Sequence, residues 1–409
     1  MDPVNKIALL RGMTQTRTRR EALRLAGLSA TGLMLAACGV QGQKQAPAKP
    51  DAVQEYWAKQ KKTGKVVFAN WPEYMPEDKK PLEEFKKATG ISYEYKEVID
   101  ENASFFGKVD PVLRAGQSLG YDIVVMTNGI QLQHMIELGY VVQLDQSKLP
   151  NFNANAGAKY KDRSYDPGNV YTVPYTSGIT GIAYNTKYVK DDITSINALF
   201  DPKYKGRVGM MRDAQEIGNF GMFALGIDPE KSTQADWEKA GAKLKEQRDA
   251  GLVRKYYDQD YIDAVSKGDV WLTMAWSGDV FQRQLAGEPV KFVVPGEGGT
   301  IWTDNMLIPK GAANPIDAIT LMDWFYKPEI AAELEEFIQF VTPVPAAHDI
   351  LKAKVATLQG KEKTDLETLV NSPLIFPTEG DYSKLRGYTQ LTTKTEQVFN
   401  RIFQTVTQA

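Results

Sequence analysis

The chain has 409 residues, 43% of them hydrophobic and 24% charged, so it is long enough to form two packed domains. It has 49 Lys and Arg residues against 51 Asp and Glu residues, a net charge of −2, which argues against nucleic acid as a partner. A single cysteine excludes a disulfide within the chain.

Residues 1–38 have the layout of a bacterial export signal. After a basic region, a run of 13 apolar and small residues extends from Leu25 to Ala37, whereas a transmembrane helix needs about 20. The pair Arg19–Arg20 fits a twin-arginine signal, and Cys38 ends a Leu-Ala-Ala-Cys sequence that resembles a lipobox. We therefore expect an exported, periplasmic or cell-surface lipoprotein anchored through Cys38. The alternative is a buried amphipathic helix with an unrelated cysteine.

Residues 39–63 are expected to form a flexible tether and lead-in, because their first half contains Gly, Gln, Ala, Pro and Lys but almost no large apolar residue. From residue 65 onward, strand-like and helix-like patterns alternate, which favours an α/β fold. Strands are expected at 65–71, 91–99 and 121–127, and helices at 76–90, about 103–115 and 130–139. This order is typical of right-handed crossovers in a mostly parallel sheet.

The pattern continues in the second half of the chain. Residues 170–186 predict two strands around Ser177 and Gly178. Further strands are expected at 207–211, 270–276, 290–295 and around 300–305, and further helices at about 214–225, at 234–251 and over 315–341 with a break at Pro328.

Aromatic and acidic residues occur together at four predicted strand ends. Trp71 and Tyr74 follow the first strand, and ligands of open α/β sheets bind beyond the carboxyl ends of strands. The alternative is that both rings cover the edge of the sheet. Asp213 and Glu216 follow the strand at 207–211, where an acidic residue and a Glu three positions later are equally typical of a capped helix start.

The other two clusters lie later in the chain. Trp276 ends a strand and is followed by Asp279, which is compatible with a pocket or with a core tryptophan before a helix-capping aspartate. Trp302 and Asp304 are two residues apart, so an extended backbone would place them on the same face. They could form half of a pocket or belong to a half-buried strand.

Together these residues predict a site for an organic cation. An aromatic face attracts an ammonium group by roughly 0.5–2 kcal/mol, and a carboxylate at about 4 Å adds about 4 kcal/mol at an effective dielectric constant near 20, before desolvation. A neutral sugar would leave the carboxylates unpaired, which is costly. The sequence therefore favours an alkyl amine between aromatic walls.

Enzymatic interpretations have less support. The two histidines, His134 and His348, lie outside any catalytic or zinc-binding pattern, and no phosphate-binding loop or nucleophile motif occurs. We expect no enzymatic activity, no cofactor and no metal site. A hydrolase that uses a carboxylate pair, such as Asp213 with Glu216 or Asp279 with Asp304, stays open as an alternative.

Residues 64–409 resemble the spermidine/putrescine-binding receptors of bacterial ABC importers. Seven segments match in order and spacing: NWPEYMP, YDIVVMT, YTVPYTSGITGIAYN, DPKYKGRVGMMRDAQE, MAWSGD, EGGTIWTDNMLIP and TPVPAA. The resemblance implies a type II-like periplasmic-binding-protein fold, with two hinged α/β lobes that close over a polyamine. We expect one lobe at 64–176 plus 305–348 and the other at 177–304 plus 349–409.

The resemblance also implies roles for individual residues. The aromatic walls would be Trp71, Trp276 and Trp302 with Tyr74 at the rim; the amine acceptors would be Asp213, Glu216, Asp279 and Asp304; Thr127 matches a small hydroxyl position. Pro72 replaces a usual Ser or Thr, Gly129 stands where many family members have an aromatic residue, and Phe340 stands where some have tyrosine. No ligand residue can be placed after about Leu351. The expected partners are a polyamine (putrescine, spermidine or a related amine), an ABC permease with its ATPase, and the membrane through the lipid anchor, with the receptor itself a monomer.

Overall fold

The computed structural model describes residues 50–408, which belong to one compact unit, Lys44–Ala409. The predicted signal with Arg19 and Arg20, the lipidation site Cys38 and the first part of the tether lie outside the described residues. Within residues 50–408, no helix has both the length and the apolar character needed to cross a bilayer.

The second part of the expected tether is a helix, α1 (Pro50–Lys59), which corrects the prediction of a flexible lead-in. Trp57 explains the difference, because its side chain is only 3% exposed and its Nε1–H donates to the carbonyl oxygen of Gln143 at 2.8 Å. Burial of the indole and its hydrogen bond offset the entropy lost when this segment is ordered.

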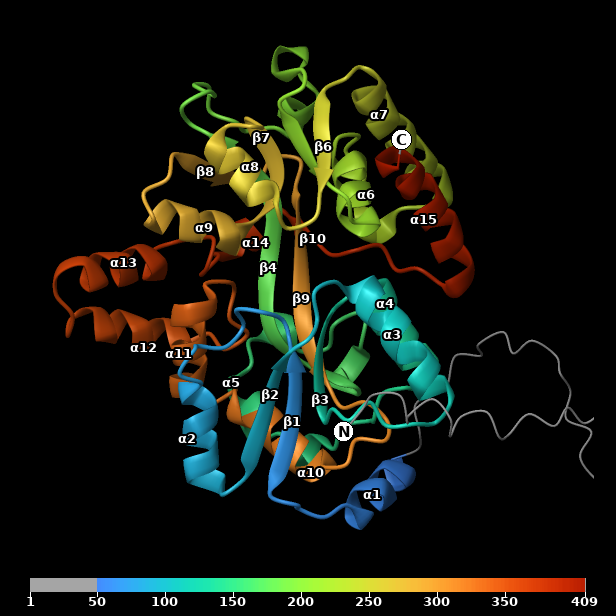
Figure 1. Cartoon of the computed structure of the whole chain (residues 1–409), viewed down its shortest axis with the longest axis vertical. Coiled ribbons are helices and arrows are strands. Elements are labelled where there is room, and N and C mark those ends of the chain that lie inside the picture. The colour runs from blue at the N-terminus through green and yellow to red at the C-terminus, as the bar shows by residue number, and fades with distance from the viewer. Residues whose placement is uncertain (1–49, 409) are drawn as a thin grey trace, which may run out of the picture. The chain divides into compact units, whose positions relative to one another are not determined.

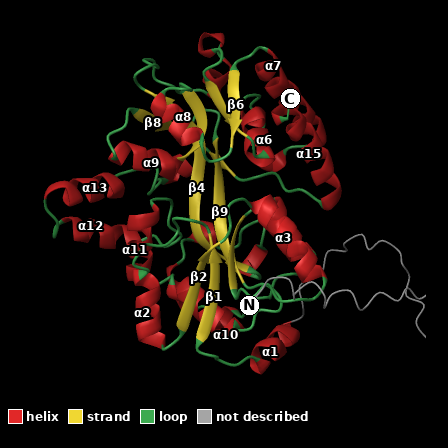
Figure 2. Cartoon of the chain, viewed as in Figure 1, coloured by secondary structure: helices red, strands yellow, loops and turns green. Residues whose placement is uncertain are grey.

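Within residues 50–408, ten strands form one sheet through the middle of the unit (Figures 1 and 2). Their order is β2-β1-β3-β9-β4-β7-β5-β6, with β10 paired to β9 and β8 paired to β4. The strands are β1 (Lys65–Asn70), β2 (Ser92–Glu97), β3 (Ile123–Thr127), β4 (Thr172–Asn185), β5 (Val208–Met211), β6 (Val253–Tyr257), β7 (Leu272–Trp276), β8 (Val290–Val293), β9 (Gly299–Leu307) and β10 (Leu385–Arg386).

The sheet is mixed, whereas a mostly parallel sheet was expected. β1 pairs in parallel with β2 and β3, and β5 pairs in parallel with β6 and β7, as the strand–helix alternation predicted. Between these two groups lie β4 and β9, which are antiparallel to each other and to their neighbours β7 and β3. Two long antiparallel strands therefore join the two parallel groups.

Within residues 170–186, where two strands were expected, Thr172–Asn185 form one continuous strand. β4 has 14 residues, and its pairing with β9 continues through Ser177 and Gly178. A register shift between Pro174 and Thr176 absorbs the position where proline cannot donate a hydrogen bond. Hydrogen bonding to β9 thus keeps the strand continuous through Ser177 and Gly178, the two residues that suggested a break.

Helices cover the sheet and mostly lie where the sequence predicted them. Helix α2 begins later than expected, at Lys80, because Lys79 has a left-handed backbone (φ 53°); it ends at Gly90 (φ 73°) as predicted. The helices after α1 are α2 (Lys80–Thr89), α3 (Asn102–Arg114), α4 (Ile130–Glu137), α5 (Pro150–Asn155), α6 (Ala214–Phe223), α7 (Gln234–Asp249), α8 (Tyr261–Lys267), α9 (Ser277–Leu285), α10 (Pro315–Trp324), α11 (Pro328–Ile338), α12 (Ala346–Val355), α13 (Gly360–Val370), α14 (Glu379–Tyr382) and α15 (Thr393–Thr407).

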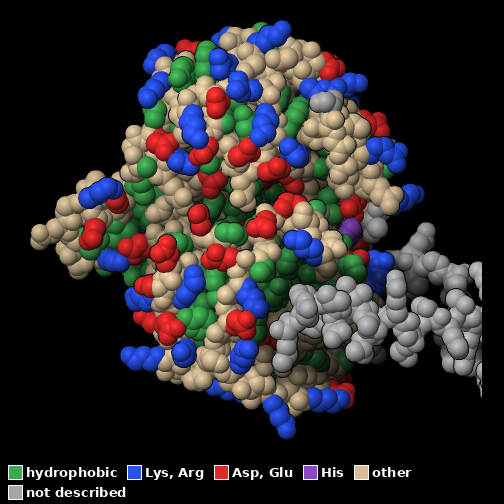
Figure 3. Space-filling view, viewed as in Figure 1, with side chains coloured by type: hydrophobic (Ala, Val, Ile, Leu, Met, Phe, Trp, Pro, Cys, Tyr) green, Lys and Arg blue, Asp and Glu red, His purple; other side chains and the backbone are tan. Residues whose placement is uncertain are grey.

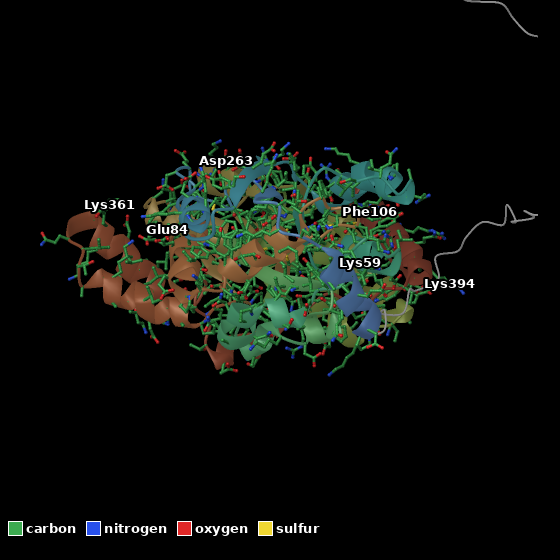
Figure 4. The ribbon with its side chains drawn as sticks, turned by 90° about the horizontal axis from the view of Figure 1, so that it is seen from below. Lys59, Glu84, Phe106, Asp263, Lys361 and Lys394 are labelled. Carbon is green, nitrogen blue, oxygen red and sulfur yellow. The ribbon has the colours of Figure 1, made fainter. Side chains whose placement is uncertain are left out.

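The two parallel groups have separate hydrophobic cores. A first cluster packs β1 and β3 against α2, α10 and α11, and a second packs β5 and β7 against α6, α7 and α15. Leu351, Leu366 and Leu369 belong to the first cluster, although residues 349–409 were expected in the second lobe. The reason is that α12 packs against α11 and α13 packs against α12. This helix pair projects to one side (Figure 1), and Lys361 lies at that edge in the view from below (Figure 4).

Candidate functional site

The predicted site residues lie at the ends of the parallel strands and along β9. Trp71 follows β1, Thr127 ends β3, Trp276 ends β7, and Asp213 follows β5. The register places Asp304 of β9 opposite Thr127, Trp302 opposite Gly178, and Trp276 opposite Thr180. Pairing across the sheet therefore brings together residues that are far apart in the sequence.

Asp304 is a buried carboxylate held by two hydroxyl groups. It is 2% exposed, and its Oδ1 accepts a hydrogen bond from Thr127 Oγ1 at 2.6 Å while its Oδ2 accepts one from Tyr74 OH at 2.7 Å. Burial raises the pKa of Asp304 to about 6, although both hydrogen bonds favour the charged form. The structure thus joins three predicted site residues directly.

A connected series of aromatic rings begins at Tyr74, the tyrosine bonded to this carboxylate. The Phe340 ring lies 5.3 Å from the Trp302 ring and 6.5 Å from the Tyr74 ring, between centroids, and Trp302 meets Trp276 edge to face at 6.1 Å. Phe340 contacts both Trp302 and Tyr74, the tyrosine that binds Asp304. Trp302 and Asp304 therefore face the same side of β9, as the alternation of side chains predicted. Trp302 packs over Gly178, where a Cβ atom would lie 2.1 Å from indole Cζ2, so only glycine leaves room for the ring.

Glu216 is the most unusual carboxylate of the site. It is 3% exposed, and its Oε1 accepts hydrogen bonds from Thr180 Oγ1 and Tyr388 OH, both at 2.8 Å. Its Oε2 is buried and has no hydrogen-bond partner among residues 50–408. Burial, followed by the nearby charge of Asp213, raises the pKa of Glu216 to about 7.

Asp213 caps helix α6, the alternative that the sequence left open. Its Oδ1 accepts hydrogen bonds from the backbone N–H groups of Gln215 and Glu216, both at 2.9 Å. The side chain is nevertheless exposed, so capping does not prevent contact with a ligand.

Asp279 is half-buried in the first turn of α9, which begins at Ser277, and is therefore not the helix cap that one interpretation proposed. Tyr261 OH donates to its Oδ2 and accepts the backbone N–H of Trp276 at 3.0 Å. The Tyr261 and Trp276 rings meet edge to face at 5.8 Å. Burial raises the pKa of Asp279 to about 6.

The four carboxylates lack positive partners. Among residues 50–408, no Lys, Arg or His forms an ion pair with any of the four. The charge of Arg283 acts on Asp279, but Arg283 is itself paired with Asp263 and Glu288. Figure 3 shows acidic side chains gathered across the middle of this face, with Lys and Arg mainly toward its two ends. The same part of the chain has no group of three His, Cys, Asp or Glu side chains placed to hold a metal ion.

Several contacts of the site were not foreseen from the sequence. Tyr388 and Thr180 hold Glu216, and Tyr261 holds Asp279. Tyr388 lies in the segment after Leu351, where no ligand residue could be placed. The pattern of residues around it carries no local signal, because its role depends on packing against a helix 172 residues earlier in the chain.

Comparison with known proteins shows which sequences this chain resembles. Residues 80–362 match the model of the family described as bacterial extracellular solute-binding protein. The chain is 32% identical over 310 residues to the spermidine/putrescine-binding periplasmic protein of Escherichia coli (75% of this chain, 85% of the relative). It is 30% identical over 350 residues to the putrescine-binding periplasmic protein SpuD of Pseudomonas aeruginosa (81% of this chain, 89% of the relative).

A solved structure confirms the predicted fold class. The spermidine/putrescine ABC transporter substrate-binding protein PotD of Streptococcus pneumoniae superimposes with a TM-score of 0.70 at 24% identity, covering 84% of this chain and 98% of that one. The two parallel strand groups joined by β4 and β9 are thus the two hinged lobes of a periplasmic-binding-protein fold. Its sheet, its site and its relatives together place the chain in the family of bacterial extracellular solute-binding proteins.

Proposed function

We propose that this protein captures a polyamine of the putrescine or spermidine type and delivers it to an ABC permease and its ATPase. The observation that carries this proposal is the set of four carboxylates, two of them almost fully buried and three of them hydrogen-bonded to tyrosine hydroxyl groups, without a single paired cation in residues 50–408. The names of the relatives support the same ligand class.

The chemistry of the site matches a chain of ammonium groups and methylene spacers. Buried carboxylates without partners lose hydration and regain little inside the protein, so a cationic ligand relieves that cost. Indole faces can cover the methylene groups and attract the adjacent ammonium groups by roughly 0.5–2 kcal/mol each. No bond needs to be made or broken in this function.

Each site residue then has a role that awaits a direct test. Trp71, Trp276 and Trp302 would form walls around the alkyl chain, with Tyr74 at the rim. The ammonium groups would be accepted by Asp304, Asp279, Glu216 and Asp213, and Thr127 would orient Asp304. Contacts to both lobes would favour the closed form through a hinge at the crossover strands β4 and β9.

Isothermal titration calorimetry tests the ligand class. Putrescine and spermidine should bind saturably, with affinity falling as salt rises, and should be recovered unchanged after incubation. 1-Butylamine, which lacks the second ammonium group, and 1,4-butanediol, which lacks both, are the controls. Absence of heat with every amine would refute the proposal, and cleavage of a glycoside by the protein would favour the hydrolase alternative.

One observation favours a second candidate, an amine that also carries an oxygen acceptor. The Nε1–H groups of Trp71 and Trp302 are buried without an acceptor in the described residues, and a simple polyamine offers none. A hydroxylated or acylated amine would supply one. Including 1,4-diamino-2-butanol and N-acetylputrescine in the titration separates the candidates, because tighter binding of either compound than of putrescine would select the second.

We further propose that the protein is exported and anchored by a lipid on Cys38. The basic region, apolar run and Leu-Ala-Ala-Cys sequence support this proposal. Labelling of growing cells with a radioactive fatty acid should mark the protein and should fail with Cys38→Ser. Replacement of both Arg19 and Arg20 by lysine should block export if the twin-arginine route is used.

A further inference from the structure

One hydrogen bond joins the two lobes next to the segments that carry Glu216 and Asp304. The backbone N–H of Ile130, the first residue of α4, donates to Gln215 Oε1 of α6 at 3.1 Å. Helix α4 has no capping side chain of its own, so Gln215 satisfies a backbone donor of the other lobe. The Gln215 side chain is 7% exposed, so this contact is shielded from solvent.

Close packing at Gly129 makes this contact specific. Gly129 has a positive φ of 139°, and a Cβ atom there would lie 2.5 Å from Gln215 Oε1. Any larger residue would therefore push the amide away from Ile130. The Ile130 side chain is 5% exposed and packs into the hydrophobic cluster of the second lobe, which reinforces the contact.

Each end of the hydrogen bond is connected, through the chain or through further hydrogen bonds, to one of the proposed amine acceptors, Glu216 or Asp304. On one side, Gln215 immediately precedes Glu216 in the first turn of α6. On the other side, Asn128 exchanges two hydrogen bonds with the backbone of Thr303, at 2.8 and 2.7 Å. Thr303 precedes Asp304, and Thr127 holds the Asp304 carboxylate. A short, largely hydrogen-bonded path thus connects Glu216 to Asp304.

We propose that Gln215 is a specificity-determining residue that sets the separation between Glu216 and Asp304, and with it the length of diamine that binds best. The inference rests on the proposed function. A diamine that is one methylene too short or too long cannot place both ammonium groups at hydrogen-bond distance from these carboxylates. Since the attraction between charges weakens with distance, a fixed separation turns ligand length into a difference in affinity.

Calorimetry with diamines of increasing length tests the proposal. The series is 1,3-diaminopropane, putrescine, cadaverine and 1,6-diaminohexane, titrated into the wild-type protein and into Gln215→Met. Methionine has nearly the same length as glutamine but lacks the acceptor for the Ile130 N–H. The wild-type protein should prefer one length over its neighbours by about tenfold or more, and Gln215→Met should reduce this preference to about threefold or less.

Gln133→Ala is the matched control. Gln133 of α4 also bridges to the second lobe, because its Nε2 donates to Gln390 Oε1 at 2.6 Å, but it contacts none of the four carboxylates. This variant should weaken all diamines by a similar factor and keep the preferred length. Thermal unfolding of both variants verifies that they fold.

The outcomes separate the inference from the proposed function. If Gln215→Met keeps the wild-type length preference, or if the wild-type protein binds all four diamines equally, the inference is wrong and the proposed function stands. If the wild-type protein binds no amine, the proposed function itself fails. A flattened length profile in Gln215→Met alone, with an unchanged profile in Gln133→Ala, supports the inference.

Discussion

Replacing Glu216 by glutamine removes one negative charge from the site and leaves its shape almost unchanged. The amide oxygen can still accept the hydrogen bonds of Thr180 and Tyr388, which both bind Oε1. The amide nitrogen takes the place of Oε2, the oxygen that is buried without a partner. Because the Trp276 side chain also interacts with this carboxylate, urea denaturation of the variant is measured alongside binding, and a loss of amine binding in a stably folded variant reports the charge of Glu216.

The loss of affinity can be estimated. Removing one partner of a buried charge pair costs about 2–4 kcal/mol, which corresponds to a rise in Kd of about 30- to 1000-fold at pH 8. The pKa of Glu216 is raised to about 7, so about 1% of wild-type molecules carry the ionised carboxylate at pH 5. Wild-type affinity should therefore fall by about 20- to 80-fold between pH 8 and pH 5 from this group alone, because the neutral form still binds at the level of Glu216→Gln; the difference from Glu216→Gln should shrink by the same factor.

Without ligand, the free energy of unfolding should rise as pH falls, whereas the affinity for the amine should decrease. The folded pKa of about 7 lies above the ordinary value of 4.5, so the folded state binds more protons than the unfolded state between these pH values. The free energy of unfolding then falls as pH rises through this window, by about 3 kcal/mol in total. Glu216→Gln avoids this cost and should be more stable than wild type at pH 8 but not at pH 4.5.

Calorimetry with putrescine at pH 5 and pH 8, together with urea denaturation at pH 4.5 and pH 8, measures both effects. Glu362→Gln is the control, because it makes the same chemical change on an exposed residue of α13. The reasoning is refuted if Glu216→Gln binds putrescine within about threefold of wild type at pH 8, or if it keeps the full wild-type pH dependence.

Three further predictions concern neighbouring groups. Asp304→Asn should weaken amine binding by about 1–3 kcal/mol at pH 8 in calorimetry, and an unchanged Kd would exclude Asp304 from the site. Gly178→Ala should lower the free energy of unfolding by about 1–3 kcal/mol in urea and change tryptophan fluorescence, because its Cβ would lie 2.1 Å from Trp302 Cζ2; an unchanged urea midpoint would contradict the packing argument. His134 Nε2 lies 2.6 Å from Glu396 Oε2, and this contact raises the pKa of His134. The contribution of the ion pair to the free energy of unfolding is therefore fully present below the ordinary pKa of 6.5 and is lost as pH rises through the folded pKa. His134→Gln should thus cost more stability at pH 5.5 than at pH 9, and equal costs at the two pH values would show that the ion pair is unimportant.

Local sequence patterns predicted much of the architecture, because the ends of helices and the alternation of side chains along strands depend only on neighbouring residues. The end of α2 at Gly90 follows from the need for a left-handed backbone after the helix. The shared side of Trp302 and Asp304 follows from the alternation of side chains along β9. The strand–helix order also predicted the two parallel groups, whereas it could not reveal that β4 and β9 pair antiparallel between them.

The same local pattern could not assign the roles of Asp213 and Glu216. A helix cap and an amine acceptor require the same residue types at the same spacing. Packing instead gives the two residues different surroundings: Asp213 caps α6 and stays exposed, while Glu216 is buried against Thr180 and Tyr388, which are 36 and 172 residues away. Such long-range contacts leave no periodic trace in the sequence.

The sequence by itself thus determined the fold class, most of the helices and strands and the kinds of side chain at the site, because periodicity, capping and charge act over a few residues or through composition. Only the tertiary structure decided that residues 50–59 form a helix, that α12 and α13 join the first hydrophobic cluster, and that Gln215 reaches the start of α4. Each of these depends on which distant surfaces meet, and burial is a property of the folded chain, not of any segment alone.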